Sequence, residues 1–214
     1  MKDTVIFDLD GTLLNTLEDL ADSVNFALKE NGCPLRTYDE VRSFVGNGVR
    51  VLIKRSVPEG TENEKYEEIF ACFREHYLGN MYNKTAPYEG IIPLLEHLRD
   101  RGYKIGVVSN KLDEAVRELC DDFFGDFIDC AKGARGEDDR KPNPENVYAC
   151  IEKLGSEKME CVYIGDSEVD LQTAKNAGIA CICASWGFRT EAELISAGAV
   201  NIAHTPMDVT EFLK

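Results

Sequence analysis

Short apolar runs alternate with amphipathic stretches from about residue 90 to the end of the chain. The helix patterns lie at 90–101, 112–123, 144–154 and 168–177, and the apolar runs lie at 103–109, 127–131, 161–165 and 180–184. Near-continuous apolar runs are typical of strands that are buried on both faces of a parallel sheet. A similar run covers 4–8, and a last helix and short strand close the chain. The pattern predicts an α/β fold with a Rossmann-like parallel sheet and helices on both of its faces.

The pattern between the first strand and about residue 82 is helical instead. Residues Leu17, Leu20, Val24 and Leu28 recur on one face of a predicted helix at 17–31. Further helix patterns cover 38–44, 48–56 and 62–78, without a strand pattern among them. The sequence therefore predicts a core domain made of residues 1–15 and 83–214, interrupted by an all-helical domain at 16–82.

Composition narrows the range of partners. The 214 residues carry a formal net charge of −15, which argues against binding a nucleic-acid backbone or an anionic membrane surface. No apolar run approaches the length of a membrane span, and the first apolar stretch contains charges, unlike a signal peptide. Eight cysteines are scattered without a CxxC pair, so we expect reduced thiols and a cytoplasmic protein. The oligomeric state stays open between monomer and homodimer.

Polar residues follow several of the predicted strands at the point where each strand ends. Ligands bind beyond the carboxyl ends of strands in open α/β sheets, so such residues should converge although they are far apart in sequence. The residues are Asp8, Asp10, Ser109, Asn110, Asp166 and Asp170, together with Lys141 in a loop before a helix. A turn would explain the Asp-x-Asp-Gly stretch by itself, but it would not explain the whole set.

These residue types suit phosphoryl chemistry with a divalent cation. Asp8, Asp10 and Asp166 offer hard oxygen ligands, for which Mg²⁺ is the natural partner. Of two carboxylates on one short loop, one can act as a nucleophile and the other as a general acid and base. The hydroxyl of Ser109 and the ammonium of Lys141 suit the oxygens of a transferred phosphoryl group.

Four short motifs carry a family resemblance. The stretches "DLDGT" at 8–12, "VVSNK" at 107–111, "KPNP" at 141–144 and "GDSEVD" at 165–170 resemble, in order, the four motifs of the haloacid dehalogenase superfamily. The resemblance covers essentially the whole chain. It implies a Rossmann-like core, Mg²⁺ as cofactor, and a mechanism that passes through an aspartyl-phosphate.

The same resemblance implies a role for each matched residue. It implies Asp8 as nucleophile and Asp10 as general acid and base that also gives a main-chain carbonyl to Mg²⁺. It implies Ser109 as phosphoryl ligand, Lys141 as the neutralising cation and Asp166 as a metal ligand. Thr12, which would support the loop, and Asn110 are expected on the substrate-binding side of the site. Asp170 would position Lys141 or the water shell of the metal, and it is counted with Asp8, Asp10 and Asp166 among the residues of the metal site. An acid in the first turn of a helix, favoured by the helix dipole, is the other interpretation of Asp170.

The second aspartate and the helical insertion narrow the branch of the superfamily. Dehalogenases of the superfamily lack the second aspartate, so the presence of Asp10 favours phosphoryl chemistry. The insertion resembles the small cap of a subfamily that includes phosphoglycolate phosphatases, β-phosphoglucomutases and a bacterial pyrophosphatase. The mutases carry a histidine just past the first motif, whereas the stretch here, "NTLEDLADSV", has none.

The segment at 44–57 resembles the substrate-facing part of the phosphoglycolate phosphatase cap. Gly48 would let the backbone approach a ligand, and Arg50 would bind a carboxylate or second anion. The alternative is a plain helix start with a solvated basic face. Trp186 and Arg189, in a loop after a strand, would either reach the mouth of the site or simply pack.

The sequence thus predicts a Mg²⁺-dependent phosphatase that acts on a small phosphorylated metabolite, with 2-phosphoglycolate as the leading substrate. Pyrophosphate or a nucleotide is the nearest alternative substrate, and a phosphosugar mutase and a non-catalytic binding module are further alternatives. We expect the cap to move about hinges near 14–18 and 82–88.

Overall fold

A computed structural model describes residues 2–213, and its contacts divide the chain into two compact units. The core unit is formed by residues up to Leu14 and from Pro87 onward, and the helical unit by Asn15–Ala86. The sequence placed the two boundaries after residues 15 and 82. The chain crosses between the units at β2 (Leu14–Asn15) and β3 (Ala86–Pro87), which pair as a two-stranded sheet. Strands of two residues carry no periodicity, so the sequence pattern did not predict them.

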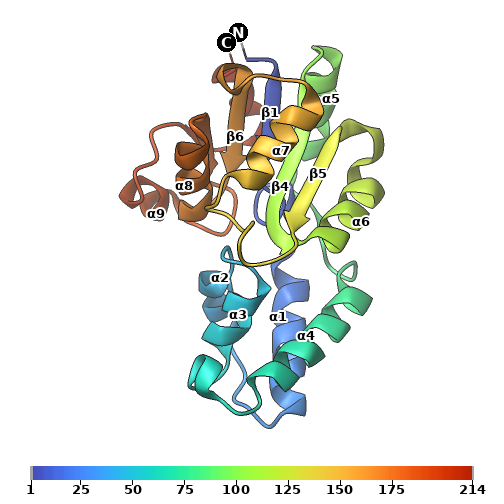
Figure 1. Cartoon of the computed structure of the whole chain (residues 1–214), viewed down its shortest axis with the longest axis vertical. Helices are drawn as coiled ribbons and strands as arrows, with labels where there is room; N and C mark the ends of the chain where they lie inside the picture. The colour runs from blue at the N-terminus through green and yellow to red at the C-terminus, as the bar shows by residue number, and fades with distance from the viewer. Residues whose placement is uncertain (1, 214) are drawn as a thin grey trace. The chain divides into compact units, whose positions relative to one another are not determined.

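The core unit is built on one parallel sheet of six strands in the order β5-β4-β1-β6-β7-β8 (Figure 1). These strands are β1 (Thr4–Phe7), β4 (Lys104–Leu112), β5 (Cys130–Ala134), β6 (Cys161–Gly165), β7 (Ala180–Ala184) and β8 (Ile202–Ala203). All four residues of β1 and all five of β6 are buried, as their unbroken apolar runs predicted. The predicted α/β class is confirmed.

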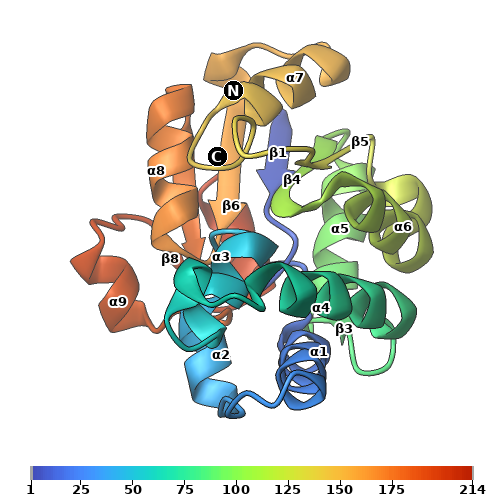
Figure 2. The same ribbon diagram turned by 60° about the horizontal axis from the view of Figure 1, so that its bottom comes forward.

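Helices cover both faces of this sheet. Figures 1 and 2 show α7 and α8 on one face of the strands and α5 and α6 on the other. The bounds of the core-unit helices are α5 (Ile91–Asp100), α6 (Asp113–Phe124), α7 (Glu145–Leu154), α8 (Glu168–Ala177) and α9 (Glu191–Ser196), with 3₁₀ turns η2 (Gly125–Phe127), η3 (Lys158–Glu160) and η4 (Pro206–Glu211). The chain runs from β1 through α5 to β4 and through α6 to β5, then returns through α7 to β6 on the other side of β1 and continues through α8 to β7.

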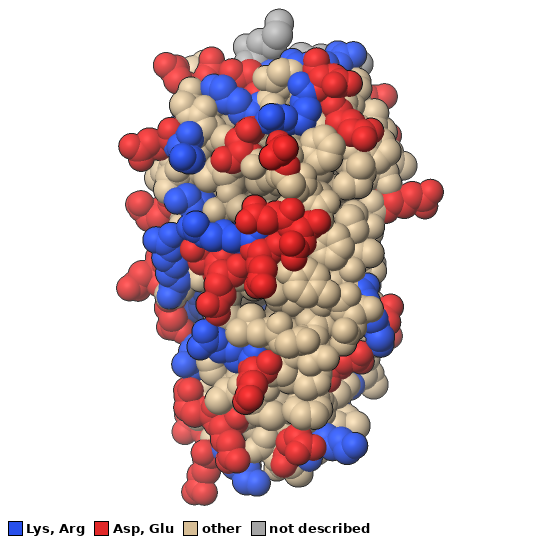
Figure 3. All heavy atoms as spheres, turned by 90° about the vertical axis from the view of Figure 1, so that its right-hand side faces the viewer, with Lys and Arg blue, Asp and Glu red and all other residues tan. Residues whose placement is uncertain are grey.

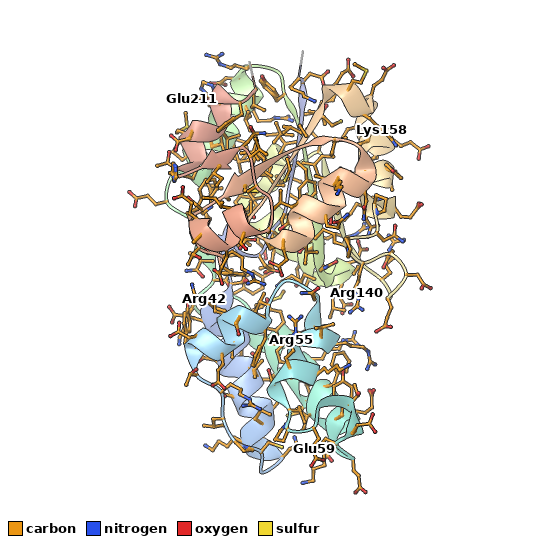
Figure 4. All side chains as sticks on the ribbon, turned by 90° about the vertical axis from the view of Figure 1, so that its left-hand side faces the viewer. Arg42, Arg55, Glu59, Arg140, Lys158 and Glu211 are labelled. Atoms are coloured by element: carbon orange, nitrogen blue, oxygen red, sulfur yellow. The ribbon has the colours of Figure 1, made fainter. Side chains whose placement is uncertain are left out.

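Apolar side chains fill the space between the sheet and its helices (Figure 4). On the α7 and α8 face, Ile6, Val108 and Tyr163 pack with Val147 and Ala174 in one buried cluster. Tyr163 is fully buried, and its hydroxyl donates to the Val108 carbonyl at 2.8 Å. This apolar cluster therefore contains one polar group, the Tyr163 hydroxyl, which lies close to Lys141.

The helical unit packs four helices around its own apolar interior. They are α1 (Leu17–Glu30), α2 (Tyr38–Phe44), α3 (Val49–Ser56) and α4 (Tyr66–Asn80), with the 3₁₀ turn η1 (Gly60–Glu62) before α4. Buried Asp19 on α1 accepts hydrogen bonds from the backbone N–H groups of Lys84 and Thr85 and from the Thr85 hydroxyl. These bonds fasten the segment after α4 to the start of α1. Within residues 2–213, every helix is too short or too polar to cross a membrane.

Two strands differ from their predicted bounds. β4 continues to Leu112 rather than ending at 109, and its register with β5 shifts between Val108 and Leu112. β5 begins at Cys130 and contains the polar and small residues Lys132 and Gly133, so its apolar signal is weak. An edge strand with one side partly solvated does not need a continuous apolar run, which explains why its bounds were misplaced.

Charged side chains of both signs are mixed over the face that Figure 3 shows, and no broad basic surface covers that face. Acidic side chains gather near the middle of this face, beside basic side chains at its left edge. The expectation that the chain does not bind nucleic acid stays a prediction from its charge.

Candidate active site

Three buried carboxylates meet at the carboxyl edge of the sheet. Asp8 follows β1, Asp166 follows β6, and Asp170 lies in the first turns of α8. Since β1 and β6 are adjacent and pair Phe7 with Ile164, the residues just beyond them reach the same edge. One carboxylate oxygen from each of the three lies within 4.8 Å of the others. The convergence that the strand topology predicted is therefore present.

The Lys141 ammonium lies among these carboxylates. Its Nζ is 2.9 Å from Asp8 Oδ1 and 2.7 Å from Asp170 Oδ1, and it donates to the Tyr163 hydroxyl at 3.0 Å. The Lys141 side chain is 2 % exposed. A charge buried this deeply is stable only with ionic and hydrogen-bonding partners, and Lys141 has all three.

The loop that carries Lys141 is held by Asn110 at the end of β4. The Asn110 amide donates to the Lys141 carbonyl at 3.1 Å and accepts from the Lys141 backbone N–H at 2.7 Å. This two-way pairing fixes the backbone from which the ammonium extends. Asn110 thus contacts the Lys141 backbone in the structure, whereas its contact with a phosphoryl group stays a prediction.

Burial and like charges shape the protonation of the cluster. Burial raises the pKa of Asp8 to about 7, although the Lys141 ammonium acts to lower it. Burial and then the charges of Asp170 and Asp8 raise the pKa of Asp166 well above its ordinary value. Burial by itself would lower the pKa of Lys141, but Asp170 and Asp8 outweigh it and raise that pKa well above normal. Without a cation these carboxylates are therefore harder to ionise than ordinary aspartates, and a nearby positive charge would favour their ionised forms.

The residues present fit a divalent cation. Three carboxylates and one ammonium leave two negative charges, which one dication balances. The donors are all carboxylate oxygens, the chemistry that Mg²⁺ prefers. Close packing leaves no room for side chains beside Asp166, because a Cβ at Gly11 or Gly187 would meet its carboxylate within 2.5 Å. This cluster is a candidate metal centre.

Asp170 combines the two roles that the sequence left open. Its Oδ1 pairs with Lys141, while its Oδ2 accepts from the backbone N–H and the hydroxyl of Ser167, which closes a capping box at the start of α8. Both oxygens of this fully buried carboxylate are engaged by the protein. We therefore interpret Asp170 as the residue that holds Lys141 in place, and its direct contact with a metal stays a prediction.

Lys111 is a candidate functional residue that the sequence reasoning missed. Its Nζ lies 2.7 Å from Asp10 Oδ1, and its side chain is 2 % exposed. Lys111 was part of the quoted motif "VVSNK", so a buried lysine directly after an apolar strand was the available signal. The pairing gives Asp10, which extends from the same loop as Asp8, a cationic partner of its own.

The register shift in β4 explains how Ser109 and Lys111 reach the edge. Between Val108 and Leu112 the strand has more residues than the facing part of β5, as in a β-bulge that re-aims side chains. Ser109 is 3 % exposed, and its Oγ accepts from the Lys111 backbone N–H at 3.3 Å. Ser109 and Lys111 therefore belong to β4 and lie near its carboxyl end, where the pairing with β5 is irregular.

Thr12 and Trp186 meet beside the loop that carries Asp8 and Asp10. The Trp186 indole donates to the Thr12 carbonyl at 2.9 Å. The Thr12 hydroxyl is buried and has no hydrogen-bond partner among residues 2–213. The loop is therefore steadied through the Thr12 backbone rather than through its side chain.

Gly48 and Arg50, the predicted substrate-binding residues of the cap, belong to the helical unit. Gly48 precedes α3 with φ of 83°, a conformation that glycine permits. Arg50 pairs with Glu67 on α4 at 2.9 Å and lies over the Phe70 ring, beside a surface pocket of about 420 Å³. Its role toward a substrate stays a prediction.

Neighbouring cations of the helical unit are also bound within that unit. Arg55 on α3 donates to the Phe44 carbonyl at 2.9 Å, and Arg42 on α2 lies 3.9 Å from Asp39 (both arginines are labelled in Figure 4). The alternative of a solvated basic face for residues 44–57 is thus only part of the description, because Arg50 and Arg55 also make specific contacts.

Comparisons with known proteins agree with this geometry. The sequence family described as haloacid dehalogenase-like hydrolase matches residues 5–184. A phosphoglycolate phosphatase of Aquifex aeolicus is 36% identical over 185 residues, covering 86% of this chain and 85% of that protein. A phosphoglycolate phosphatase of Caulobacter vibrioides is 32% identical over 210 residues, covering 96% of this chain and 88% of that protein.

A similar solved structure extends the likeness to the whole chain. The crystal structure of a candidate phosphoglycolate phosphatase from Lactobacillus delbrueckii subsp. bulgaricus superposes with a TM-score of 0.94 at 34% identity. The superposition covers 100% of this chain and 99% of that chain. The family resemblance of the four motifs is confirmed.

The candidate metal centre predicts a Mg²⁺-dependent gain in stability. At a Mg²⁺ concentration about 100 times its dissociation constant, binding should add about 2.7 kcal/mol to the free energy of unfolding. We expect a rise in the thermal midpoint of the wild-type protein that Asp166→Asn abolishes, because the variant loses one anionic ligand. Exposed Asp121→Asn is the matched control and should keep the rise. An equal rise in Asp166→Asn would place the cation elsewhere.

Proposed function

This chain belongs to the haloacid dehalogenase-like hydrolases and is a phosphatase, and we propose that it hydrolyses a small phosphomonoester through a covalent intermediate on Asp8 with bound Mg²⁺. The leading substrate is 2-phosphoglycolate. One observation carries the proposal: the Asp8 carboxylate lies 2.9 Å from a buried ammonium in a cluster of carboxylates that fits a dication.

The residues at the edge divide the work of phosphoryl transfer. Asp8 would attack the phosphorus, so that a bond forms between its carboxylate oxygen and phosphorus while the bond to the ester oxygen breaks. Asp10 would give its proton to the leaving oxygen and then take a proton from the water that hydrolyses the aspartyl-phosphate. Lys141 and Ser109 would neutralise and orient the phosphoryl oxygens.

The cation would be held by carboxylates of Asp8 and Asp166, with the Asp10 main-chain carbonyl as a further ligand implied by the family. When bound, Mg²⁺ would offset the charge of the phosphoryl group and relieve the repulsion between these carboxylates. The protein supplies the fixed frame. Asp170, Tyr163 and Asn110 hold the Lys141 side chain and backbone in the position described above.

The names of the relatives support phosphoglycolate as substrate, since those at 36% and 32% identity are both phosphoglycolate phosphatases. In this proposal the helical unit acts as the cap, and Gly48 and Arg50 provide the contact with the substrate carboxylate. Movement of the cap would exclude water during attack by Asp8 and admit it afterwards. Pyrophosphate and nucleotides remain the alternative substrates that the same core chemistry allows.

A substrate panel tests the proposal. We expect phosphate release from 2-phosphoglycolate to exceed release from pyrophosphate, nucleotides and phosphosugars, to require Mg²⁺, and to stop with chelator. Asp8→Asn should abolish turnover, because an amide is a poor nucleophile, while the circular dichroism spectrum stays that of the wild type. Isomerised phosphosugar instead of free phosphate would indicate a mutase.

The outcomes of this panel separate the parts of the proposal. Release led by pyrophosphate or a nucleotide would keep the role of the core residues and remove the substrate assignment. Substantial turnover by folded Asp8→Asn would remove the nucleophile assignment. No release from any compound in the panel would favour a non-catalytic binding protein.

The pair of Lys111 and Asp10 gives a separate prediction. Lys111→Met leaves the Asp10 carboxylate without its ammonium, so Asp10 should lose its fixed position for proton transfer. General acid-base catalysis contributes about 10²–10⁴-fold, and we expect roughly 10- to 100-fold of this to be lost in kcat. KM and the Mg²⁺-dependent thermal shift should change little. Exposed Lys175→Met is the control, and a raised KM at unchanged kcat would make Lys111 a substrate-binding residue instead.

A further inference from the structure

The loop Ser185–Thr190, between β7 and α9, contacts Asp166 of the candidate metal centre and two segments beside it, and the proposed reaction uses none of these contacts. Trp186, Phe188 and Arg189 each reach a different part of the edge. We refer to residues 185–190 as the Trp186 loop. The partners of these three contacts, Thr12, Asp166 and Glu168, lie within the core unit.

The first contact fixes one oxygen of Asp166. The Phe188 backbone N–H donates to Asp166 Oδ2 at 2.6 Å in a buried position. The same oxygen lies between two glycines, since a Cβ would be 2.3 Å from it at Gly11 and 2.5 Å from it at Gly187. Oδ2 is thus enclosed by backbone, which leaves Oδ1 as the oxygen for a cation.

The second contact ties the Trp186 loop to the segment that carries the nucleophile. The Trp186 indole donates to the Thr12 carbonyl at 2.9 Å, across 174 positions of sequence. A Cβ at Gly187 would also come within 2.3 Å of the Gly11 carbonyl. The Trp186 loop therefore lies directly against the Asp8–Thr12 segment as well as against Asp166.

The third contact anchors the Trp186 loop to α8. Arg189 pairs with Glu168 through two hydrogen bonds, of 2.9 Å from Nε and 3.2 Å from a terminal nitrogen. The Arg189 side chain is 10 % exposed, so the pair is partly shielded from water. Glu168 is two residues after Asp166, and the ion pair consequently fixes the loop relative to the segment that presents Asp166.

We infer that the Trp186 loop positions Asp166 for a divalent cation, with Gly187 and Arg189 as its positioning residues. This inference rests on the metal role of Asp166 in the proposed function. Mg²⁺ demands near-ideal octahedral geometry, so a small rotation of one ligand weakens its binding. Partners that orient metal ligands typically contribute about 10- to 100-fold to metal affinity.

A loop that only packs against the sheet would behave differently. Disturbing such a loop would lower the thermal midpoint without changing the affinity for Mg²⁺. A positioning loop should instead raise the Mg²⁺ concentration needed for half-saturation and leave kcat at saturating Mg²⁺ near the wild-type value. The Mg²⁺ requirement and the stability of the apo protein are thus the two quantities to separate.

Two variants of the full chain test the inference by different routes. Gly187→Ala presses a methyl group on Asp166 and the Gly11 carbonyl, and exposed Gly136→Ala, where a Cβ meets open space, is its matched control. Arg189→Gln removes the ion pair with Glu168 without adding volume, and Arg189→Lys should restore part of the effect. Should Gly187→Ala fail to fold, the Arg189 variants still decide the question.

Mg²⁺ binding is read by calorimetry and by intrinsic fluorescence, because Trp186 is the only tryptophan of the chain and lies in the loop under test. We expect the Mg²⁺ half-saturation point to rise about 10- to 100-fold in Gly187→Ala and several-fold in Arg189→Gln, with Gly136→Ala unchanged. The Mg²⁺ concentration for half-maximal phosphatase activity should shift in parallel.

The outcomes that overturn the inference differ from those that overturn the proposed function. Wild-type affinity for Mg²⁺ in folded Arg189→Gln, accompanied by a lower thermal midpoint, would make the loop a packing element and leave the proposed function intact. Absence of Mg²⁺ binding by the wild-type protein would overturn the metal role of Asp166 and the inference together.

Discussion

The Lys141 ammonium lies against Asp8 and Asp170, two buried carboxylates that would otherwise repel each other at the edge of the sheet. Each carboxylate loses its hydration on burial, and removal of one partner from such a group leaves an uncompensated charge. Neighbouring residues hold the Lys141 ammonium and its carboxylate partners in place. Tyr163 accepts a hydrogen bond from the ammonium, Asn110 fixes the Lys141 backbone, and the start of α8 presents Asp170.

Parallel strand pairing is what assembles these partners from distant parts of the chain. β1 and β6 are neighbours in register, so Asp8 and Asp166 leave the sheet side by side although they are far apart in sequence. The bulge of β4 then adds Ser109 and Lys111 on the other side of β1. One edge of the sheet therefore holds the carboxylates of Asp8, Asp166 and Asp170, the ion pair of Asp10 with Lys111, and the Lys141 ammonium. This combination suits the transfer of a phosphoryl group.

Much of this arrangement could be predicted because runs of apolar residues mark the strands, and the strand order then places the residues at their ends. Buried parallel strands need unbroken apolar runs, so β6 and β7 were predicted with their observed bounds. The meeting of Asp8, Lys141, Asp166 and Asp170 followed from strand topology alone. By contrast, the bulge in β4 is a property of its pairing with β5, and the lysine just after the apolar run in "VVSNK" does not reveal that it pairs with Asp10. The bond from Trp186 to Thr12 likewise depends on packing between distant segments.

The central claim is that Asp8 itself receives the phosphoryl group. The most direct test uses Asp10→Asn with an aryl phosphate, whose leaving group needs no proton, so that the covalent intermediate forms but its hydrolysis lacks a base. The account predicts a stoichiometric burst of phenolate, and mass spectrometry of the acid-quenched protein should locate one phosphoryl group on the peptide that contains Asp8. Steady hydrolysis of the same ester by the wild-type protein, with neither a burst nor a phosphorylated peptide in the variant, would contradict it.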